Sequence, residues 1–442
     1  MTWTPRRILA ASWLAFVLFA YPGFMKIDAL DELVDARMGE ISDWHSPVMT
    51  ELWRIVNIVV AGPAGMLVVQ SVLLVAGCYH LLRRTMSERG AAIAAACVLW
   101  FPPIVATEAQ VSADTLLASV LVAAAAALAS ARPRVRLGGL ALAAFAGGLR
   151  DGAALAALPI VVALFRRRDG DRGWRRAALA LGAWAITVLA AHAASHAIVD
   201  SRTERAEVAR AIDDAVGTLS RAPDLDDAEL RELLAGAPLA TTIDVQGRAR
   251  AVYDTPRSYA SGGDRVFDVP HDDAQRDALL DARVALARAA PRAYLAHRWH
   301  HLANELAMSH RFGAMYAEFV PDPSLRENVR YAAHHSLLQD TLLAPLRWLS
   351  RTFWFRPYLY AVLAIVLLPL AVARRQHAAA LLLASALAHV AALFVWSVAT
   401  DYRDSHWLIV ATTLALVIMV SEARHERVGE QTAPRVARDE HV

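Results

Sequence analysis

The sequence predicts an all-α polytopic membrane protein with about ten transmembrane segments and a mainly helical extracytoplasmic insertion. Hydrophobic residues make up 56% of the chain, and the mean hydropathy is +0.33. Several apolar runs are long enough to cross about 30 Å of hydrocarbon at about 1.5 Å per helical residue. Arginine clusters separate the runs, as cytoplasmic connectors commonly do. The net charge of only +2 argues against a nucleic-acid partner.

Ten apolar segments are candidates for membrane spans. They run at about residues 8–22, 55–82, 90–106, 113–131, 137–149, 152–165, 177–199, 357–373, 378–399 and 407–421. The first follows Arg6 and Arg7, as the apolar core of a signal peptide would. No small-x-small cleavage site precedes Tyr21, so we expect an uncleaved first helix.

Arginine also orients these segments. The Arg-rich connectors are residues 83–89, 132–136, 166–176 and 374–375. The positive-inside rule places them in the cytoplasm together with the N-terminus, so the loops between them face outward.

The path of residues 137–165 has two alternatives, because arginines flank this stretch on both sides. Either it is a hairpin broken near Gly147, Gly148 and Gly152, or it is one long helix with Arg150 at mid-membrane and an inverted later topology. Each arm of the hairpin has only about 13 residues, which is short for an independent span. We favour the hairpin, with both arms buried among other helices.

Four parts follow from this arrangement. They are an N-terminal membrane module of about seven segments (1–199) with an acidic first outer loop (23–54), the extracytoplasmic helical segment (200–341), a C-terminal membrane module of about three segments (342–421) and a disordered cytoplasmic tail (422–442). The insertion begins with two amphipathic helical patterns, RTERAEVARAIDDAVGTLS and PDLDDAELRELLAG. A further helical pattern at 274–310 breaks at Pro291.

The first outer loop is unusually acidic. Its stretch YPGFMKIDALDELVDARMGEISDWHSPVMTELW contains seven carboxylates and one histidine. The carboxylates that share one helical face are Asp28, Asp31, Glu32 and Asp35. A solvated amphipathic helix would explain such a charge run. The fixed turn at Pro22 and Gly23, and His45 within DWHSP, favour a functional loop with Asp28 at the membrane rim.

Other charged residues face the same side. Glu108 and Asp114 lie in the second outer loop, where Asp114 has the alternative role of a helix N-terminal cap. Arg150 and Arg403 lie near the hydrocarbon on the outer side, where the positive-inside bias does not explain them. Each is a candidate phosphate ligand through its planar fork. The alternative is an ion pair, of Arg150 with Asp151 or of Arg403 with Asp401 or Asp404.

The histidines at 297, 300 and 301 have metal-like spacing, with Glu305 one turn further on. They lack the H-E-x-x-H order of a zinc hydrolase. With Tyr294 and Trp299 nearby, this segment is interpreted as a helix lying against the bilayer. The sequence also lacks a Walker motif, a Gly-rich phosphate loop and a G-x-S-x-G elbow, so neither ATP hydrolysis nor serine acyl transfer is indicated.

Five short patterns occur together along the chain. They are PG-x(4)-D and D-W-H-x-P in the first outer loop, SADTLLA in the second, LRDGA, and DYR before the last segment. This combination resembles the C-type (GT-C) superfamily of integral membrane glycosyltransferases. It is most similar to bacterial branches that use dolichyl-phosphate-mannose or undecaprenyl-phosphate sugars as donors.

The resemblance implies a function and a role for each residue. The expected activity is inverting transfer of a sugar from a polyprenyl-phosphate donor to an acceptor hydroxyl, on the outer face of the bacterial inner membrane. Asp28 is implied as the catalytic base, Asp114 or Glu108 as the second acidic residue, and Arg150 and Arg403 as phosphate ligands. His45 and Glu108 are further candidates for substrate binding.

No cofactor is required for this chemistry, because the donor phosphate already makes a good leaving group. A divalent metal is possible if Asp28 and Asp114 converge. The expected partners are the polyprenyl-phosphate-linked sugar and membrane lipid. Two other classes remain open. A transporter or flippase would predict inverted repeats and charges at the membrane midplane, and a non-catalytic scaffold would bind a partner through the insertion.

Overall fold

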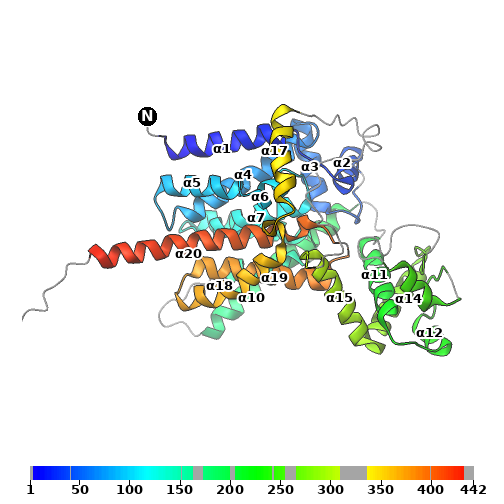
Figure 1. Ribbon diagram of the computed structural model, residues 1–442. Helices are drawn as coiled ribbons and strands as arrows, with labels where there is room; N and C mark the ends of the chain where they lie inside the picture. The colour runs from blue at the N-terminus through cyan, green and yellow to red at the C-terminus, as the bar shows by residue number, and fades with distance from the viewer. Residues whose placement is uncertain are drawn as a thin grey trace, which may run out of the picture.

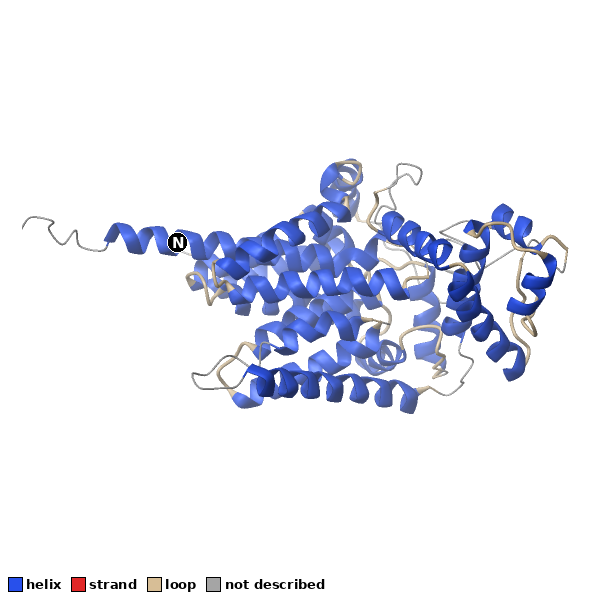
Figure 2. Cartoon of the chain, turned by 90° about the horizontal axis from the view of Figure 1, so that it is seen from below, coloured by secondary structure: helices blue, strands red, loops and turns tan. Residues whose placement is uncertain are grey.

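A computed structural model describes residues 3–39, 41–150, 152–162, 173–199, 205–240, 243–253, 265–308, 336–398 and 400–432. Within these ranges every regular element is a helix, so the predicted all-α class is confirmed. Figure 2 shows helices joined by loops and no strand among the described residues.

The N-terminal half supplies ten helices among its described residues. They are α1 (Pro5–Ala20), α2 (Ile27–Met38), α3 (Pro47–Val59), α4 (Ala64–Leu82), α5 (Glu88–Leu99), α6 (Pro102–Glu108), α7 (Ala113–Leu128), α8 (Pro133–Leu149), α9 (Ala153–Val162) and α10 (Gly173–Ile198). The C-terminal part adds α17 (Leu337–Leu349), η2 (Phe353–Phe355), α18 (Pro357–Ala373), α19 (His377–Trp396), η3 (Tyr402–Ser405) and α20 (His406–Thr432). Residues from both halves share one apolar core, so the two predicted membrane modules form a single bundle.

The insertion has a smaller core of its own. Its helices are α11 (Arg205–Arg221), α12 (Asp227–Leu233), α13 (Val245–Val252), α14 (Asp273–Ala289) and α15 (Pro291–Glu305). The predicted amphipathic helices and the break at Pro291 are confirmed. Buried residues of α11, α13 and α14 form a second apolar cluster, and α15 packs against both α11 and α19. In Figure 1 the insertion lies at one end of the bundle, and the N-terminus and the far end of α20 lie at the other.

The expected count of about ten membrane spans is wrong for the described residues. Four helices are long and apolar enough to cross a membrane: Ala64–Leu82, Trp174–Ile198, His377–Trp396 and Tyr402–Arg424. A fifth is obtained if Glu88–Leu99 and Pro102–Glu108, which meet at an angle of 70°, count as one broken span. The remaining apolar helices, among them α7, α9 and α18, have 10–17 residues.

Helix length explains most of the difference, because five of the predicted segments correspond to helices of only 10–17 residues: α1, α7, α8, α9 and α18. Helix breaks within two other apolar runs add to it. The predicted span 55–82 is divided between α3 and α4, and Pro63 precedes the second helix. The predicted span 90–106 bends where Pro102 begins α6. Hydropathy does not register these breaks, because the residues on both sides of each proline remain apolar.

The predicted hairpin within residues 137–165 is confirmed as far as the described residues extend. α8 ends at Leu149, Arg150 has an extended backbone, and α9 begins at Ala153 and packs against α8. Gly152 has a φ of +77°, a conformation that favours glycine. Asp151, the ion-pair partner considered for Arg150, lies outside the described residues, as do residues 433–442 of the predicted tail. α20 continues to Thr432, beyond residue 421 where the predicted segment ends.

Close helix contacts in the bundle depend on small residues. A Cβ atom added to Gly77 of α4 would lie 2.7 Å from Val122 Cγ1 and 2.9 Å from the backbone nitrogen of Ala123 on α7. Because both atoms belong to a neighbouring helix, the backbones of α4 and α7 approach each other directly at this point.

We therefore expect Gly77→Ala to destabilise the protein by about 1–3 kcal/mol through overpacking. Gly182→Ala in α10 is the matched control, because no described atom lies within 4 Å of the position its Cβ would take. The control should be neutral or slightly stabilising, since alanine favours helix over glycine by about 1 kcal/mol. Thermal unfolding in detergent measures both variants, and equal unfolding midpoints would contradict the close contact.

Candidate functional site

Backbone pairing joins the two predicted outer loops. The Phe24 N–H donates to the carbonyl oxygen of Ala109 at 3.0 Å, and the Val111 N–H donates to that of Phe24 at 2.9 Å. Gly23 has a φ of +113°, and a Cβ there would lie 3.0 Å from a Val111 methyl group. This explains the glycine before the acidic helix, and the pairing brings the start of α2 close to the start of α7.

Asp114 lies in the first turn of α7 but does not cap it. Ser112 is the N-cap, and it forms a capping box with Thr115. The cap role considered for Asp114 is therefore wrong. Instead its carboxylate accepts two hydrogen bonds from the Arg150 guanidinium, one from Nε at 2.7 Å and one from Nη2. This is the bidentate geometry that arginine forms with carboxylates.

Two aspartates of the segment before α20 complete the network. Arg150 Nη2 lies 2.8 Å from Asp404 Oδ1. Arg403 contacts Asp28 through Nη2, and its Nε lies 3.1 Å from Asp401 Oδ2 and 3.8 Å from Asp114 Oδ2. Of the ion pairs considered from sequence, Arg403 with Asp401 is confirmed, whereas Asp404 pairs with Arg150.

The structure thus brings together Asp28, Asp114, Arg150 and Arg403, which were selected separately from sequence. We call these four residues, with Asp401 and Asp404, the ion-pair cluster. Its interior is closed, because the side chains of Asp114 and Arg403 are only 5% and 8% exposed. Its edge is open, with the side chains of Asp28 and Arg150 57% and 41% exposed. A ligand reaching the cluster would meet these two residues first.

Lys26 is a member of the site that the sequence argument missed. Lys26 is two residues before Asp28 in the chain. Its ammonium group lies 2.9 Å from Asp401 Oδ2. A signal was present, because Lys26 is the only lysine among 45 basic residues. Its placement next to the acidic helix was therefore informative.

Two buried glutamates lie beside the ion-pair cluster. Glu32, on the inner face of α2, accepts a hydrogen bond from the Thr50 hydroxyl at 3.1 Å. Burial raises the pKa of Glu32 to about 8, and the charge of Asp28 adds to this effect. Burial likewise raises the pKa of Glu305, at the end of α15, well above its usual range, and the charge of Asp404 contributes. With a pKa of about 8, Glu32 is mostly neutral at pH 7, so it adds little negative charge to the site.

His45 lies close enough to the cluster to sense its charges. Burial lowers the pKa of His45 to about 4, although the charge of Asp28 opposes the shift. The next residue, Ser46, donates a hydrogen bond to the Gly148 carbonyl at 3.1 Å, which holds this loop beside the end of α8. His45 is therefore a neutral imidazole near Arg150 at physiological pH.

Glu108 lies apart from the two arginines. Its carboxylate is buried within the bundle, 3.2 Å from His406 Nε2 and 3.2 Å from the Ser119 hydroxyl. The two candidates for the second acidic residue thus separate in space: Asp114 joins the cluster, and Glu108 pairs with a buried histidine of α20.

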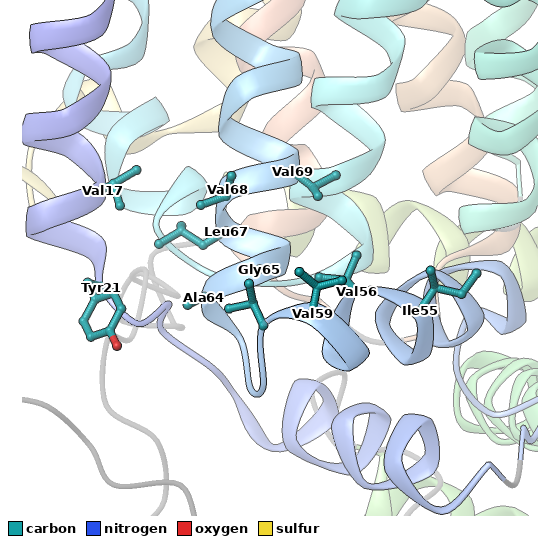
Figure 3. A pocket seen from close by; sticks show the side chains of 11 residues that line it. Val17, Tyr21, Ile55, Val56, Val59, Ala64, Gly65, Leu67, Val68 and Val69 are labelled. Atoms are coloured by element: carbon teal, nitrogen blue, oxygen red, sulfur yellow. The ribbon is translucent and has the colours of Figure 1, made fainter.

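An apolar groove of about 450 Å³ lies between α1, α3 and α4. The residues that line it in Figure 3 include Val17, Tyr21, Val56, Val59, Leu67 and Val68. Tyr21 begins the loop that leads to Asp28, so the groove and the acidic helix are neighbours along the chain. The lining is almost wholly hydrocarbon, which suits an acyl or isoprenoid chain.

The predicted metal between Asp28 and Asp114 is not favoured by the geometry, because both carboxylates contact the Arg403 guanidinium. Among the described residues, one group has the spacing of metal ligands. It consists of Asp213, His297 and His301 in the insertion. A metal site is therefore supported away from the ion-pair cluster.

The raised pKa of Glu32 predicts how stability depends on pH. Between the ordinary value of 4.5 and about 8, the unfolded chain releases a proton that the folded chain retains. The contribution of the Glu32 carboxyl group to the free energy of unfolding is therefore fully present below pH 4.5. It is lost as the pH rises through 8. We expect Glu32→Gln to remove this part of the pH dependence.

The measurement is the thermal unfolding midpoint in detergent at several pH values between about 5 and 8.5. The wild type should lose more stability than Glu32→Gln across this range. Glu229→Gln, at an exposed position on α12, should behave like the wild type. Parallel curves for the wild type and Glu32→Gln would show that Glu32 is already ionised in the folded protein.

No protein-family model, no curated protein sequence and no solved structure matches this chain.

Proposed function

We propose that this protein is a membrane glycosyltransferase that moves a sugar from a polyprenyl-phosphate donor to an acceptor hydroxyl on the extracytoplasmic face of the membrane. The observation that carries the proposal is the ion-pair cluster. Four residues chosen for separate roles in this chemistry contact one another at one end of a helical bundle. The alternative, an ion pair of each arginine with a neighbour in sequence, accounts for Arg403 with Asp401 but not for the convergence of Asp28, Asp114 and Arg150.

The charges suggest how the donor binds. Three cations, Lys26, Arg150 and Arg403, face four aspartates, so the cluster has no spare positive charge for a phosphate. A phosphate must replace one of the carboxylates. Asp28 is the natural one to leave, because it is the most exposed member and pairs with Arg403 alone among the described contacts. Exchange of one anion for another avoids leaving a buried guanidinium unpaired.

This exchange couples donor binding to catalysis. The donor phosphate takes the place of Asp28 on Arg403 and reaches the exposed edge of Arg150. The freed Asp28 carboxylate accepts the proton of the acceptor hydroxyl while that oxygen attacks the anomeric carbon. The bond from the sugar to the phosphate oxygen breaks, and the polyprenyl phosphate leaves with the bonding electrons. The two guanidinium groups stabilise its added negative charge.

The apolar groove provides for the lipid part of the donor. It lies between α1, α3 and α4, and Tyr21 at its margin is followed by the loop to Asp28. A polyprenyl chain in this groove would hold the phosphate near the start of α2. The apolar lining of the groove binds the polyprenyl chain but does not distinguish one sugar from another. Selection of the sugar therefore depends on groups near the cluster, such as the neutral His45.

Replacement of Asp28 tests the catalytic step. Asp28→Asn keeps the shape of the side chain but removes the base, so transfer should fall by about a hundredfold or more. Donor binding should be at least as tight as in the wild type, because asparagine competes less well for Arg403. The measurement is transfer from a polyprenyl-phosphate sugar by purified protein in detergent. Asp31→Asn, at an exposed position on the same helix, is the control and should transfer normally. Normal transfer by Asp28→Asn would remove Asp28 from the mechanism.

Replacement of Arg403 tests phosphate recognition. Arg403→Lys keeps the charge but loses the planar fork, so binding of undecaprenyl phosphate in detergent micelles should weaken. Arg276→Lys, which alters an arginine paired with the exposed Asp273 of the insertion, should bind normally. Thermal unfolding of both variants verifies that they fold. Wild-type affinity in a folded Arg403→Lys protein would rule out bidentate contact by this residue.

A further inference from the structure

The insertion contains a second polar cluster, far in sequence from the first. His297 and His301 lie one helical turn apart on α15 and face Asp213 of α11. All three side chains are completely buried. The sequence interpretation of α15 as a helix lying against the bilayer accounts for the exposed Trp299, but not for two buried imidazoles.

The distances in this cluster match the separation of ligand atoms around one metal ion. Asp213 Oδ2 lies 3.2 Å from His301 Nε2 and 3.5 Å from His297 Nε2. Two ligand atoms bound tetrahedrally at about 2.0–2.1 Å lie about 3.3 Å apart. Neither Nε2 atom makes a hydrogen bond of good geometry within the described chain, although both are buried. His297 Nε2 also lies 3.4 Å from Asp214 Oδ1. The two imidazole nitrogens thus converge on one carboxylate oxygen, as ligands of one ion would.

Contacts behind His297 hold its ring in place. Its Nδ1 lies 3.0 Å from the Tyr253 hydroxyl, and the Arg221 guanidinium covers the Tyr253 ring at 4.2 Å. A histidine that binds a metal usually hydrogen-bonds through its other ring nitrogen, which fixes the ring and its tautomer. The Tyr253 hydroxyl occupies that position for ligation through Nε2.

Gly217 gives independent support for a site built around this ring. It lies one turn after Asp213 inside α11, where glycine costs about 1 kcal/mol relative to alanine. A Cβ atom at this position would overlap the imidazole of His297. The helix therefore carries an unfavourable residue at the point where the imidazole needs space.

The cluster lies where the insertion meets the bundle. Asp214, next to Asp213, lies 3.3 Å from the Arg298 guanidinium. Arg298 also donates to the carbonyl oxygens of Phe394 at 2.7 Å and Ser397 at 2.8 Å, at the end of α19. The apolar core of the insertion is small, so a link between α11 and α15 would add rigidity where it is most needed.

We propose that Asp213, His297 and His301 bind one divalent transition-metal ion, with zinc favoured by the donor set, and that this ion fastens α11 to α15. Two imidazoles and a carboxylate are common ligands of zinc, and three protein ligands leave a fourth position for water. Complete burial of the ligands gives the ion a structural role. The site is independent of the proposed sugar transfer.

The test begins with the metal content of the full-length protein, purified in detergent without chelators. Elemental analysis should find about one zinc ion per chain. After chelation, added Co²⁺ should give the visible absorption of tetrahedral coordination, and added Zn²⁺ should abolish it. Chelation should also lower the thermal unfolding midpoint of the wild type.

Matched variants assign the ligands. Asp213→Asn and His301→Gln should lose the metal and the Co²⁺ spectrum, and Gly217→Ala should weaken both by displacing His297. His300→Gln, at the neighbouring position outside the cluster, should keep both. A folded wild-type protein that contains no metal and gives no tetrahedral Co²⁺ spectrum would overturn the proposal. Equal metal loss from His300→Gln and His301→Gln would do the same.

Discussion

The need to neutralise two guanidinium groups at one end of an apolar bundle constrains the rest of this structure. The Arg403 side chain is buried, and Arg150 lies beside it, so an unpaired charge here would be expensive. Their carboxylate partners come from α2, from the first turn of α7 and from the segment before α20. The break between α8 and α9 places Arg150 among them. Segments from both halves of the chain must therefore meet at this end to complete the network.

The insertion helps to position the ion-pair cluster, because its helix α15 contacts the end of α19. Ser397 accepts a hydrogen bond from Arg298, and its hydroxyl lies 3.3 Å from Glu305. These contacts fix the end of α19, which leads directly into the segment that carries Asp401, Arg403 and Asp404. The position of the insertion thereby affects the geometry of the ion-pair cluster. A metal between α11 and α15 would stiffen this connection without taking part in the chemistry.

Sequence reasoning was effective where the physical signal is local. Composition and periodicity predicted an all-helical chain with apolar helices, and the position of Arg150 and Arg403 next to predicted spans identified both arginines. The number of spans was overestimated, because five of the apolar segments form helices of only 10–17 residues and because hydropathy does not detect the bend at Pro102. Partners distant in sequence were also missed. Spacing placed His297 and His301 on one face, but only the fold brings Asp213 to them, and only the fold buries Glu32 against Thr50.

The central claim is that the ion-pair cluster handles a lipid-linked sugar at the membrane surface. Its most direct test is the lipid content of cells that lack this protein, compared with the same cells supplied with it. Mass spectrometry of membrane extracts should find a polyprenyl-phosphate sugar that accumulates in its absence and returns to the normal amount when the protein is restored. Unchanged amounts of every polyprenyl-phosphate sugar in the two extracts would contradict the account.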